Sequence, residues 1–215
     1  MPVSDRARTS KLPGYHSDNW RKWEFDNALY QKHLEWYLDR IYKCLRSTGA
    51  HNVLDVGCGE GIVYRAMRAR GYSGAWTGFD ASDEAVRLAR QLSPDANWRQ
   101  GSANQIPFPD KSFDLVFSAQ VFEHLPNPAP ALHECTRVAQ RWLLLSVPRE
   151  PWFRALTWCA IKLKLGQDPG HVNHWRPREF RRFVQAAGQL ERLDRTTVYQ
   201  IAIVRVPNLR GQVST

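Results

Sequence analysis

Three glycines at alternate positions follow directly on a short apolar run, and this feature limits the possible folds more than any other. The run ends at Asp55 and Val56, and the glycines are Gly57, Gly59 and Gly61. Glycine permits backbone angles that other residues avoid and lets a ligand lie against the main chain. In open α/β sheets, ligands bind in the crevice beyond the carboxyl ends of the strands. The pattern therefore predicts an α/β protein with a ligand site at this turn.

The spacing of the glycines argues against two common nucleotide-binding loops. A dinucleotide-binding G-x-G-x-x-G turn would need its third glycine at position 62, where the chain has Ile62. A P-loop would need Gly-Lys-Ser/Thr after its glycines, and the chain has no such sequence there.

Strands and helices are predicted to alternate after the glycine turn. Apolar runs indicate strands, and apolar residues three and four apart, with polar starts and Gly or Pro stops, indicate helices. The expected strands are 51–56, 75–79, 96–100, 113–118 and 142–147, then an antiparallel pair at 190–196 and 200–206; the expected helices are 62–70, 82–92, 129–138 and 177–188. This order predicts a Rossmann-like, doubly wound, mostly parallel seven-stranded sheet with an antiparallel last strand and helices on both faces.

The 215 residues suit one domain with additions. Residues 1–17 are polar and without period, and we expect a flexible tail. Residues 18–215 are expected to form a single domain. Within it, the helical pattern of 18–48 is interpreted as an N-terminal lid, and 148–178, where the alternation breaks, as an insertion on the substrate side.

Composition limits the partners. A formal charge of +9 and a pI near 9.7 would attract polyanions or an acidic membrane surface, although scattered basic residues also fit a solvated face. No apolar stretch approaches the ~18–20 residues that cross a bilayer, and the first residues carry no signal-peptide core, so a cytoplasmic location is expected. The four cysteines lack zinc-ligand spacing and are expected to be reduced.

Further motifs follow at the ends of the next strands. Asp80 ends the second strand, where an acid can accept both hydroxyls of a ribose; a helix-capping role is the alternative. The segments 101–108 and 113–125 follow in order. Together with the glycine turn, these motifs resemble class I S-adenosylmethionine-dependent methyltransferases of the small-molecule, methyltransferase-11-like type. The resemblance is close over 53–147 and weak over 170–188.

The resemblance implies S-adenosylmethionine as cofactor and S-adenosylhomocysteine as product. It places the methionine part against the glycine turn, the ribose on Asp80 and the adenine edge on Ser102. The family often has an acid where this chain has Ser102, and a hydroxyl bonds the adenine amino group less strongly than a charge does. The implied cofactor residues are Asp55, Gly57, Cys58, Gly59, Gly61, Asp80, Ala81, Ser102, Ala103, Ala119 and Gln120.

Methyl transfer from a sulfonium is an in-line displacement, to which a protein mainly contributes positioning and exclusion of water. His124 is the best candidate for a general base, because it stands just past the fourth strand and its unperturbed pKa is ~6.5. Glu123 is the second candidate. A structural role for this Glu-His pair, with the imidazole bonded to a carbonyl, remains the alternative.

Substrate contacts are expected from the 148–178 segment, at Trp152, His171, His174 and Trp175. Two histidines at this spacing could bind a metal if they lay on a helix. The flanking glycine and proline predict a loop instead, and no carboxylate lies at a matching spacing. No metal site is therefore expected. The aromatic and basic residues of 151–165 predict a helix that either roofs an apolar pocket or lies in a membrane interface.

Three functions remain open. The first is methyl transfer to a small, apolar or aromatic acceptor. A tRNA or rRNA methyltransferase is the second; the charge favours it, but the chain shows no clustered basic and aromatic residues that would follow a nucleic-acid strand. The third is an inactive cofactor-binding partner or sensor module. The sequence leaves open the acceptor atom and the oligomeric state.

Overall fold

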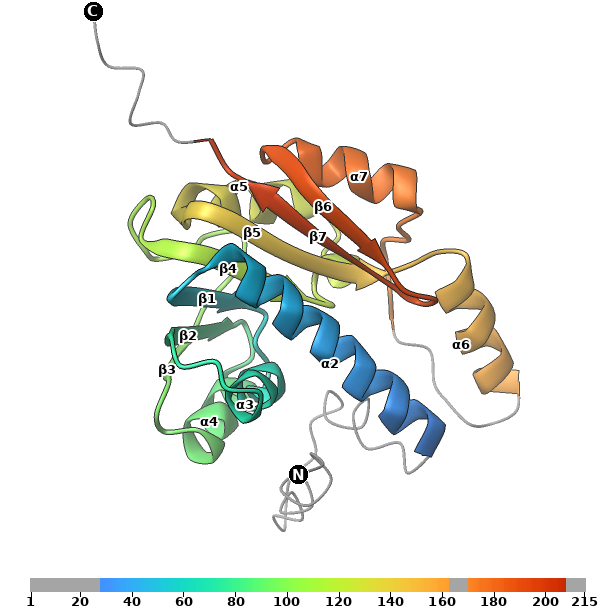
Figure 1. Ribbon diagram of the computed structural model, residues 1–215, viewed down its shortest axis with the longest axis horizontal. Coiled ribbons are helices and arrows are strands. Elements are labelled where there is room, and N and C mark those ends of the chain that lie inside the picture. The colour runs from blue at the N-terminus through green and yellow to red at the C-terminus, as the bar shows by residue number, and fades with distance from the viewer. Residues whose placement is uncertain (1–27, 163–169, 208–215) are drawn as a thin grey trace, which may run out of the picture.

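The computed structural model describes residues 28–162 and 170–207, and these form one sheet with helices on both sides (Figure 1). The strand order is β3-β2-β1-β4-β5-β7-β6. The strands are β1 Asn52–Val56, β2 Ala75–Asp80, β3 Asn97–Gln100, β4 Phe113–Ala119, β5 Ala139–Pro148, β6 Gln189–Arg195 and β7 Tyr199–Arg205. The helices are α2 Ala28–Thr48, α3 Ile62–Ala69, α4 Asp83–Leu92, the short 3-10 helix η3 Phe122–His124, α5 Pro128–Val138, α6 Trp152–Lys162 and α7 Pro177–Gln185.

The topology confirms the predicted fold class. Strands β1 to β5 pair in parallel, and β7 runs antiparallel to both β5 and β6. The order reverses between β1 and β4, which creates the crevice where open α/β sheets bind ligands. Most bounds lie within one or two residues of those expected. The largest difference among the strands is at β5, which begins at Ala139 rather than Trp142; its polar residues Gln140 and Arg141 are exposed and gave no apolar signal.

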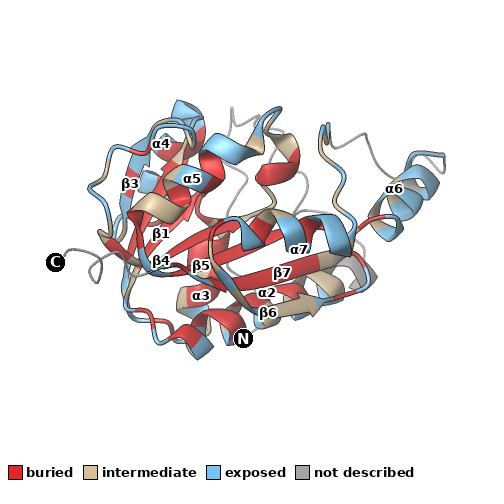
Figure 2. Ribbon diagram, turned by 90° about the horizontal axis from the view of Figure 1, so that it is seen from above, coloured by how far each residue is buried: buried red, intermediate tan, exposed pale blue. Residues whose placement is uncertain are grey.

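Two apolar clusters cover the faces of the sheet. Because side chains alternate along a strand, Val53 enters the cluster under α2, α3 and α4, whereas Leu54 enters the one under α5 and α7. Figure 2 shows the central strands as the most buried part of the molecule. Burying a side chain of this size stabilises the fold by about 1.5–3 kcal/mol.

The predicted lid and insertion are partly described. Helix α2 packs against α3, β5 and β7, while residues 18–27 and the predicted tail lie outside the described residues. Helix α6 projects away from the sheet (Figures 1 and 2). Residues 163–169 of the insertion also lie outside the described part. Within the described ranges, no helix is both long and apolar enough to span a bilayer.

Candidate active site

The glycine turn between β1 and α3 adopts the left-handed backbone that its sequence predicts. Gly57 has φ +79° and Gly61 has φ +75°. A Cβ at Gly57 would lie 2.2 Å from Val121 Cγ2, and one at Gly61 would lie 2.5 Å from the Trp98 ring. The N–H groups of Gly57 and Cys58 donate to the Phe79 carbonyl, at 2.7 and 3.2 Å. The turn is thus tied to the end of β2 and has no room for side chains at these two positions.

Asp80 lies at the end of β2 and holds two backbone segments. Its Oδ2 accepts the Gly59 N–H at 2.8 Å, and its Oδ1 accepts the Ser82 N–H at 2.9 Å. Asp80 therefore fixes the turn before α4, whereas the helix itself is capped by Ser82, whose Oγ accepts the Ala85 N–H at 3.2 Å. The two bonds to Asp80 leave further lone pairs on both of its oxygens, because each carboxylate oxygen can accept two hydrogen bonds.

Asp55 lies inside β1 with only 2% of its surface exposed. Burial, and then repulsion from Asp80, raises the pKa of this carboxyl well above its usual range. Its Oδ2 has no hydrogen-bond partner among the described residues. A cation at the nearby turn would offset the cost of ionising Asp55.

A cleft of about 450 Å³ opens beside these residues, within the range of small-molecule sites. Of the predicted cofactor residues, Gly57, Asp80, Ala81, Ser102, Ala103 and Gln120 line it. Asp55, Cys58, Gly59, Gly61 and Ala119 are not lining residues. The lining residues that the sequence analysis assigned no role are Val56, Phe79, Gly101, Asn104, Val121 and Leu125. Val56 adjoins the glycine turn, Phe79 precedes Asp80, and the other four belong to the motif segments 101–108 and 113–125.

The exit of β4 is fixed to α2 by a hydrogen-bonded chain. Gln120 has φ +60°, its N–H donates to the Ser146 carbonyl at 2.9 Å, and its Nε2 donates to Ser146 Oγ at 3.2 Å. The Tyr37 hydroxyl donates to the same Oγ at 2.9 Å. Burial raises the pKa of Tyr37 above its usual range, so this phenol stays protonated. No local sequence pattern indicates this link, because it joins residues 109 positions apart.

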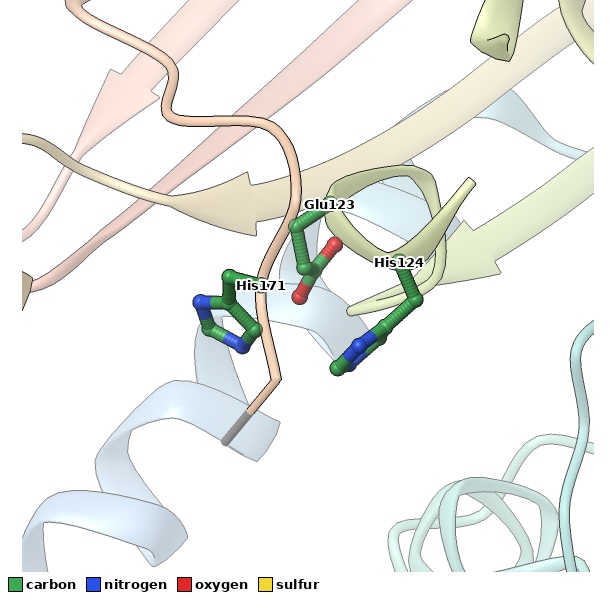
Figure 3. Close-up of side chains that lie close together, drawn as sticks. All are labelled: Glu123, His124 and His171. Carbon is green, nitrogen blue, oxygen red and sulfur yellow. The ribbon is translucent and has the colours of Figure 1, made fainter. Parts of the chain in front are cut away.

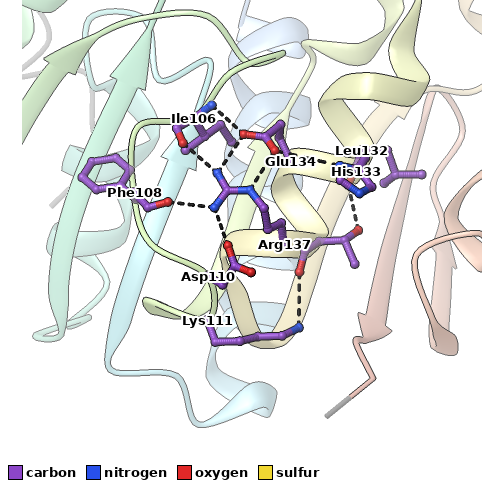
Figure 4. Close-up of polar contacts among 9 residues, drawn as sticks. Ile106, Phe108, Asp110, Lys111, Leu132, His133, Glu134 and Arg137 are labelled. Atoms are coloured by element: carbon purple, nitrogen blue, oxygen red, sulfur yellow. Dashed lines mark hydrogen bonds and ion pairs between the residues drawn. The ribbon is translucent and has the colours of Figure 1, made fainter. Parts of the chain in front are cut away.

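Beyond β3, a salt-bridge network ties the loop after the cleft-lining segment to α5 (Figure 4). The Arg137 guanidinium pairs with Glu134 at 2.8 Å and with Asp110 at 2.7 Å, and it also donates to the carbonyls of Ile106 and Phe108. Glu134 in turn accepts the Ile106 N–H at 2.8 Å. The bonds from Arg137 hold the pKa of Glu134 down to about 2.

The two candidate bases, Glu123 and His124, are neighbours beside the cleft. Glu123 and His124 belong to η3, and the loop that carries His171 lies against them (Figure 3). His124 lines the cleft, whereas the Glu123 side chain is fully buried. His124 Nδ1 lies 3.4 Å from the Gly170 carbonyl oxygen. His124 therefore both contacts a backbone carbonyl, as the structural alternative expected, and lines the cleft, as a general base would.

The four predicted substrate residues separate in the structure. His171 reaches the site, with its ring centroid 4.8 Å from that of His124. His174 turns away, with Nδ1 3.4 Å from Glu150 Oε1, and Trp175 packs on Phe183 of α7. Trp152 is 53% exposed on α6.

A row of rings missed by the sequence analysis continues from His171. Phe153 stacks on His171 with centroids 5.0 Å apart and contacts Tyr199 at 6.2 Å. Tyr199 in turn packs on Tyr37 at 4.5 Å and on His33 at 5.6 Å. These rings come from α6, β7 and α2, so only the fold brings them together.

Comparison with known proteins finds similarity to methyltransferases. Residues 54–141 match the family model described as a methyltransferase domain. A ubiquinone biosynthesis O-methyltransferase from Alkalilimnicola ehrlichii is 33% identical over 108 residues, 48% of this chain and 43% of that protein. A demethylmenaquinone methyltransferase from Thermotoga maritima is 29% identical over 102 residues, 47% of this chain and 44% of that protein. The matches thus span less than half the length of these two relatives.

A solved structure shows the same fold over nearly the whole chain. Magnesium protoporphyrin IX methyltransferase from Synechocystis, with bound S-adenosylhomocysteine, has a TM-score of 0.66 and 17% identity, covering 95% of this chain and 94% of that one. The glycine turn, the acid that ends β2 and the strand order agree with these matches, and together they support a class I S-adenosylmethionine-dependent methyltransferase.

Proposed function

We propose that the protein transfers the methyl group of S-adenosylmethionine to a small, apolar or aromatic acceptor. One observation carries the proposal: a single cleft joins the glycine turn and Asp80 at one end to His124 at the other. A cofactor held at the first end would direct its methyl group toward the second, where ionisable and aromatic side chains gather.

The residues of the cleft suit the parts of this cofactor. Asp80 would accept the ribose hydroxyls through its remaining lone pairs, and Ser102 would bond the adenine edge between Ala81 and Ala103. The methionine part would lie against the backbone of Gly57, which lines the cleft. Its ammonium would be held by backbone groups of Ala119 and Gln120. Asp55 would supply negative charge behind the turn.

S-Adenosylmethionine supplies a methyl group on a sulfonium, which leaves as a neutral thioether when an acceptor lone pair attacks in line. The chain contributes alignment and a dry surface. Val121 and Leu125 provide apolar lining in the cleft. His124 would take the acceptor's proton, and Glu123, buried beside it, is the second candidate for this role.

The acceptor end favours an aromatic compound. The rings of His171, Phe153 and Tyr199 follow one another away from His124. Aromatic pairs gain about 0.5–1.5 kcal/mol beyond the burial of their area, so a planar acceptor would be stabilised here. A relative named for ubiquinone biosynthesis and one named demethylmenaquinone methyltransferase support a quinone-type acceptor, and we propose that it carries an apolar tail.

Such a tail would explain the exposed surface of α6. Trp152, Leu156 and Trp158 are 53%, 55% and 62% exposed, and the basic Arg154 and Lys162 are exposed with them. Aromatic and basic residues together suit the boundary between lipid headgroups and acyl chains. We propose that α6 contacts a membrane interface from which a lipid-like acceptor is taken.

The first test is calorimetric titration of the purified protein with S-adenosylmethionine. We expect micromolar binding, weakened more than about tenfold in Asp80→Ala, because bonds to a charged group contribute about 1.5–3 kcal/mol each. Asp83→Ala, at the exposed start of α4, is the matched control and should bind normally. Asp80 also holds Gly59 and Ser82, so Asp80→Asn and circular dichroism separate lost recognition from lost structure. Absence of binding in the wild type contradicts the proposal.

The acceptor is tested with cofactor carrying a labelled methyl group. We expect label in alkylated catechols and none in bulk tRNA. Label in tRNA alone would establish the RNA alternative, and cofactor binding without transfer to either would favour the inactive module.

A further inference from the structure

Three side chains from two distant segments meet beside the cleft: Glu123 and His124 from η3, and His171 from the loop before α7 (Figure 3). We propose that they form a binding site for a divalent transition-metal cation of the Mn²⁺ to Zn²⁺ series. The sequence predicted no metal site because no carboxylate lies at a suitable spacing from His171 and His174. The fold supplies that carboxylate from a position 48 residues away in the sequence.

The distances are close to those of a metal centre. One ligand atom from each of the three residues lies within 4.8 Å of the other two. Ligands at about 2.0–2.2 Å from a metal lie roughly 3–4 Å from one another. Side-chain rotations that bring the atoms inward by about 1 Å would therefore complete the coordination, without movement of the backbone.

The backbone already holds the two segments in register. The N–H groups of Val172 and Asn173 both donate to the Glu123 carbonyl, at 2.9 and 3.0 Å. The Asn173 side chain donates to the carbonyls of Phe122 and Leu125 on the same turn. The two residues that follow His171 thus anchor its loop to η3 and hold the imidazole beside Glu123 and His124.

The two imidazoles are oriented by their neighbours. His124 Nδ1 faces the Gly170 carbonyl, and a proton directed there leaves the Nε2 lone pair for a metal. The His171 ring is stacked on Phe153, with 25° between the planes. A metal ligand commonly has its second nitrogen or its ring plane fixed in this way.

The charges also favour a cation. Glu123 is fully buried, and ionising a buried carboxylate is costly unless a positive charge lies beside it. Either a protonated imidazole or a metal ion could supply that charge, and the two cases are distinguishable by direct binding. Two imidazoles with one carboxylate match borderline metals, whereas Mg²⁺ and Ca²⁺ prefer sites made of oxygen ligands.

Three protein ligands leave coordination positions open, as in catalytic rather than structural sites. This part of the inference rests on the proposed function. His124 lines the cleft, so an open position would accept a hydroxyl oxygen of the acceptor. With its Nε2 on the cation, His124 would not act as the base; the cation would instead lower the pKa of that hydroxyl, and its proton would pass to water. The oxygen lone pair would then bond to the methyl carbon while the carbon–sulfur bond breaks and its electrons stay on sulfur.

Binding is tested on untagged full-length protein, stripped with a chelator and titrated with ZnCl₂, MnCl₂ and CoCl₂. We expect one tight equivalent, with visible absorption bands for bound Co²⁺. His171→Ala and Glu123→Gln should weaken binding about 100-fold or more, because each removes a ligand. His133→Ala is the matched control, since its side chain is 80% exposed on α5, and it should bind as the wild type does.

The same samples are titrated with S-adenosylmethionine, so that the two proposals fail separately. We expect cofactor affinity to be retained in His171→Ala, because His171 does not line the cleft. Metal binding without cofactor binding would contradict the proposed function alone. Equal metal affinity in wild type and His171→Ala, or no bound equivalent in the wild type, would overturn the metal site. If Glu123→Gln fails to fold, as thermal unfolding would show, His171→Ala decides the question, because its loop position lies outside the apolar core.

Discussion

The cofactor end and the acceptor end of the cleft are built differently. At the cofactor end, the glycine turn, Asp80 and the loop after β3 are each fixed by backbone hydrogen bonds or by the Arg137 network. At the acceptor end, side chains from η3, α6 and β7 meet through ring contacts, and α6 leaves large apolar side chains exposed. A cofactor common to a family needs a fixed cradle. An acceptor that differs among relatives can be read by side chains on separate elements, which vary without disturbing the sheet.

The largest effect is expected in the glycine turn, from Gly57→Ala. Its Cβ would overlap Val121 and the residue would keep φ +79°, so we expect a loss of about 2–5 kcal/mol in the free energy of unfolding. Urea denaturation of the ligand-free protein measures this loss.

Gly59→Ala is the control within the same turn. A Cβ there meets nothing within 4 Å, so only the left-handed backbone opposes it, at about 1–2 kcal/mol. Equal losses in the two variants would show that the contact with Val121 does not limit this position.

The same contrast explains what could be predicted from the sequence. The strands, the glycine turn and Asp80 follow local rules, because periodicity and glycine spacing act within a few residues. The meeting of Glu123 with His171 depends on a loop docking across 48 positions, and Tyr37 finds Ser146 across 109. His174, predicted as a substrate contact together with His171, lies beside Glu150 instead, a neighbour 24 positions away that no local pattern indicates. Polar contacts between distant segments leave no local signal, so the acceptor end was predicted least well.

The next effect concerns the network behind the adenine side. Arg137→Ala should lower the free energy of unfolding by about 1–3 kcal/mol at pH 7, because it leaves Glu134 without its guanidinium. The folded-state pKa of Glu134, about 2, is below its ordinary value, so its stabilisation is present above pH ~4.5 and is lost as the pH falls toward 2. Urea denaturation should therefore show a constant difference from pH 7 to 5 and a smaller one at pH 3. A difference that grows on acidification would contradict this origin.

A smaller loss of stability is expected from breaking the link through Ser146 between α2 and the exit of β4. Tyr37→Phe removes one hydrogen bond and keeps the ring, so the free energy of unfolding should fall by about 0.5–1.5 kcal/mol. Tyr42→Phe is the control on the same helix, since its hydroxyl accepts only an exposed bond from Arg46. The idea fails if the two variants lose the same stability.

A substitution on the exposed face of α6 should have the smallest effect on the free energy of unfolding and the largest effect on membrane binding. Trp158 is 62% exposed, so Trp158→Ser should change the free energy of unfolding by less than about 0.5 kcal/mol. It should nevertheless reduce co-sedimentation with vesicles of phosphatidylcholine and phosphatidylglycerol. In the wild type, the indole would insert into the membrane interface and nearby basic residues would contact the headgroups, which together hold the helix there. Leu92→Ser, which changes an exposed apolar residue at the end of α4, is the control and should leave vesicle binding unchanged. If both variants bind vesicles as the wild type does, α6 does not contact a membrane, and its exposed tryptophans would have to contact the acceptor directly. If Leu92→Ser weakens vesicle binding as much as Trp158→Ser, the attraction is a general property of the basic surface and does not distinguish the two ends of the cleft.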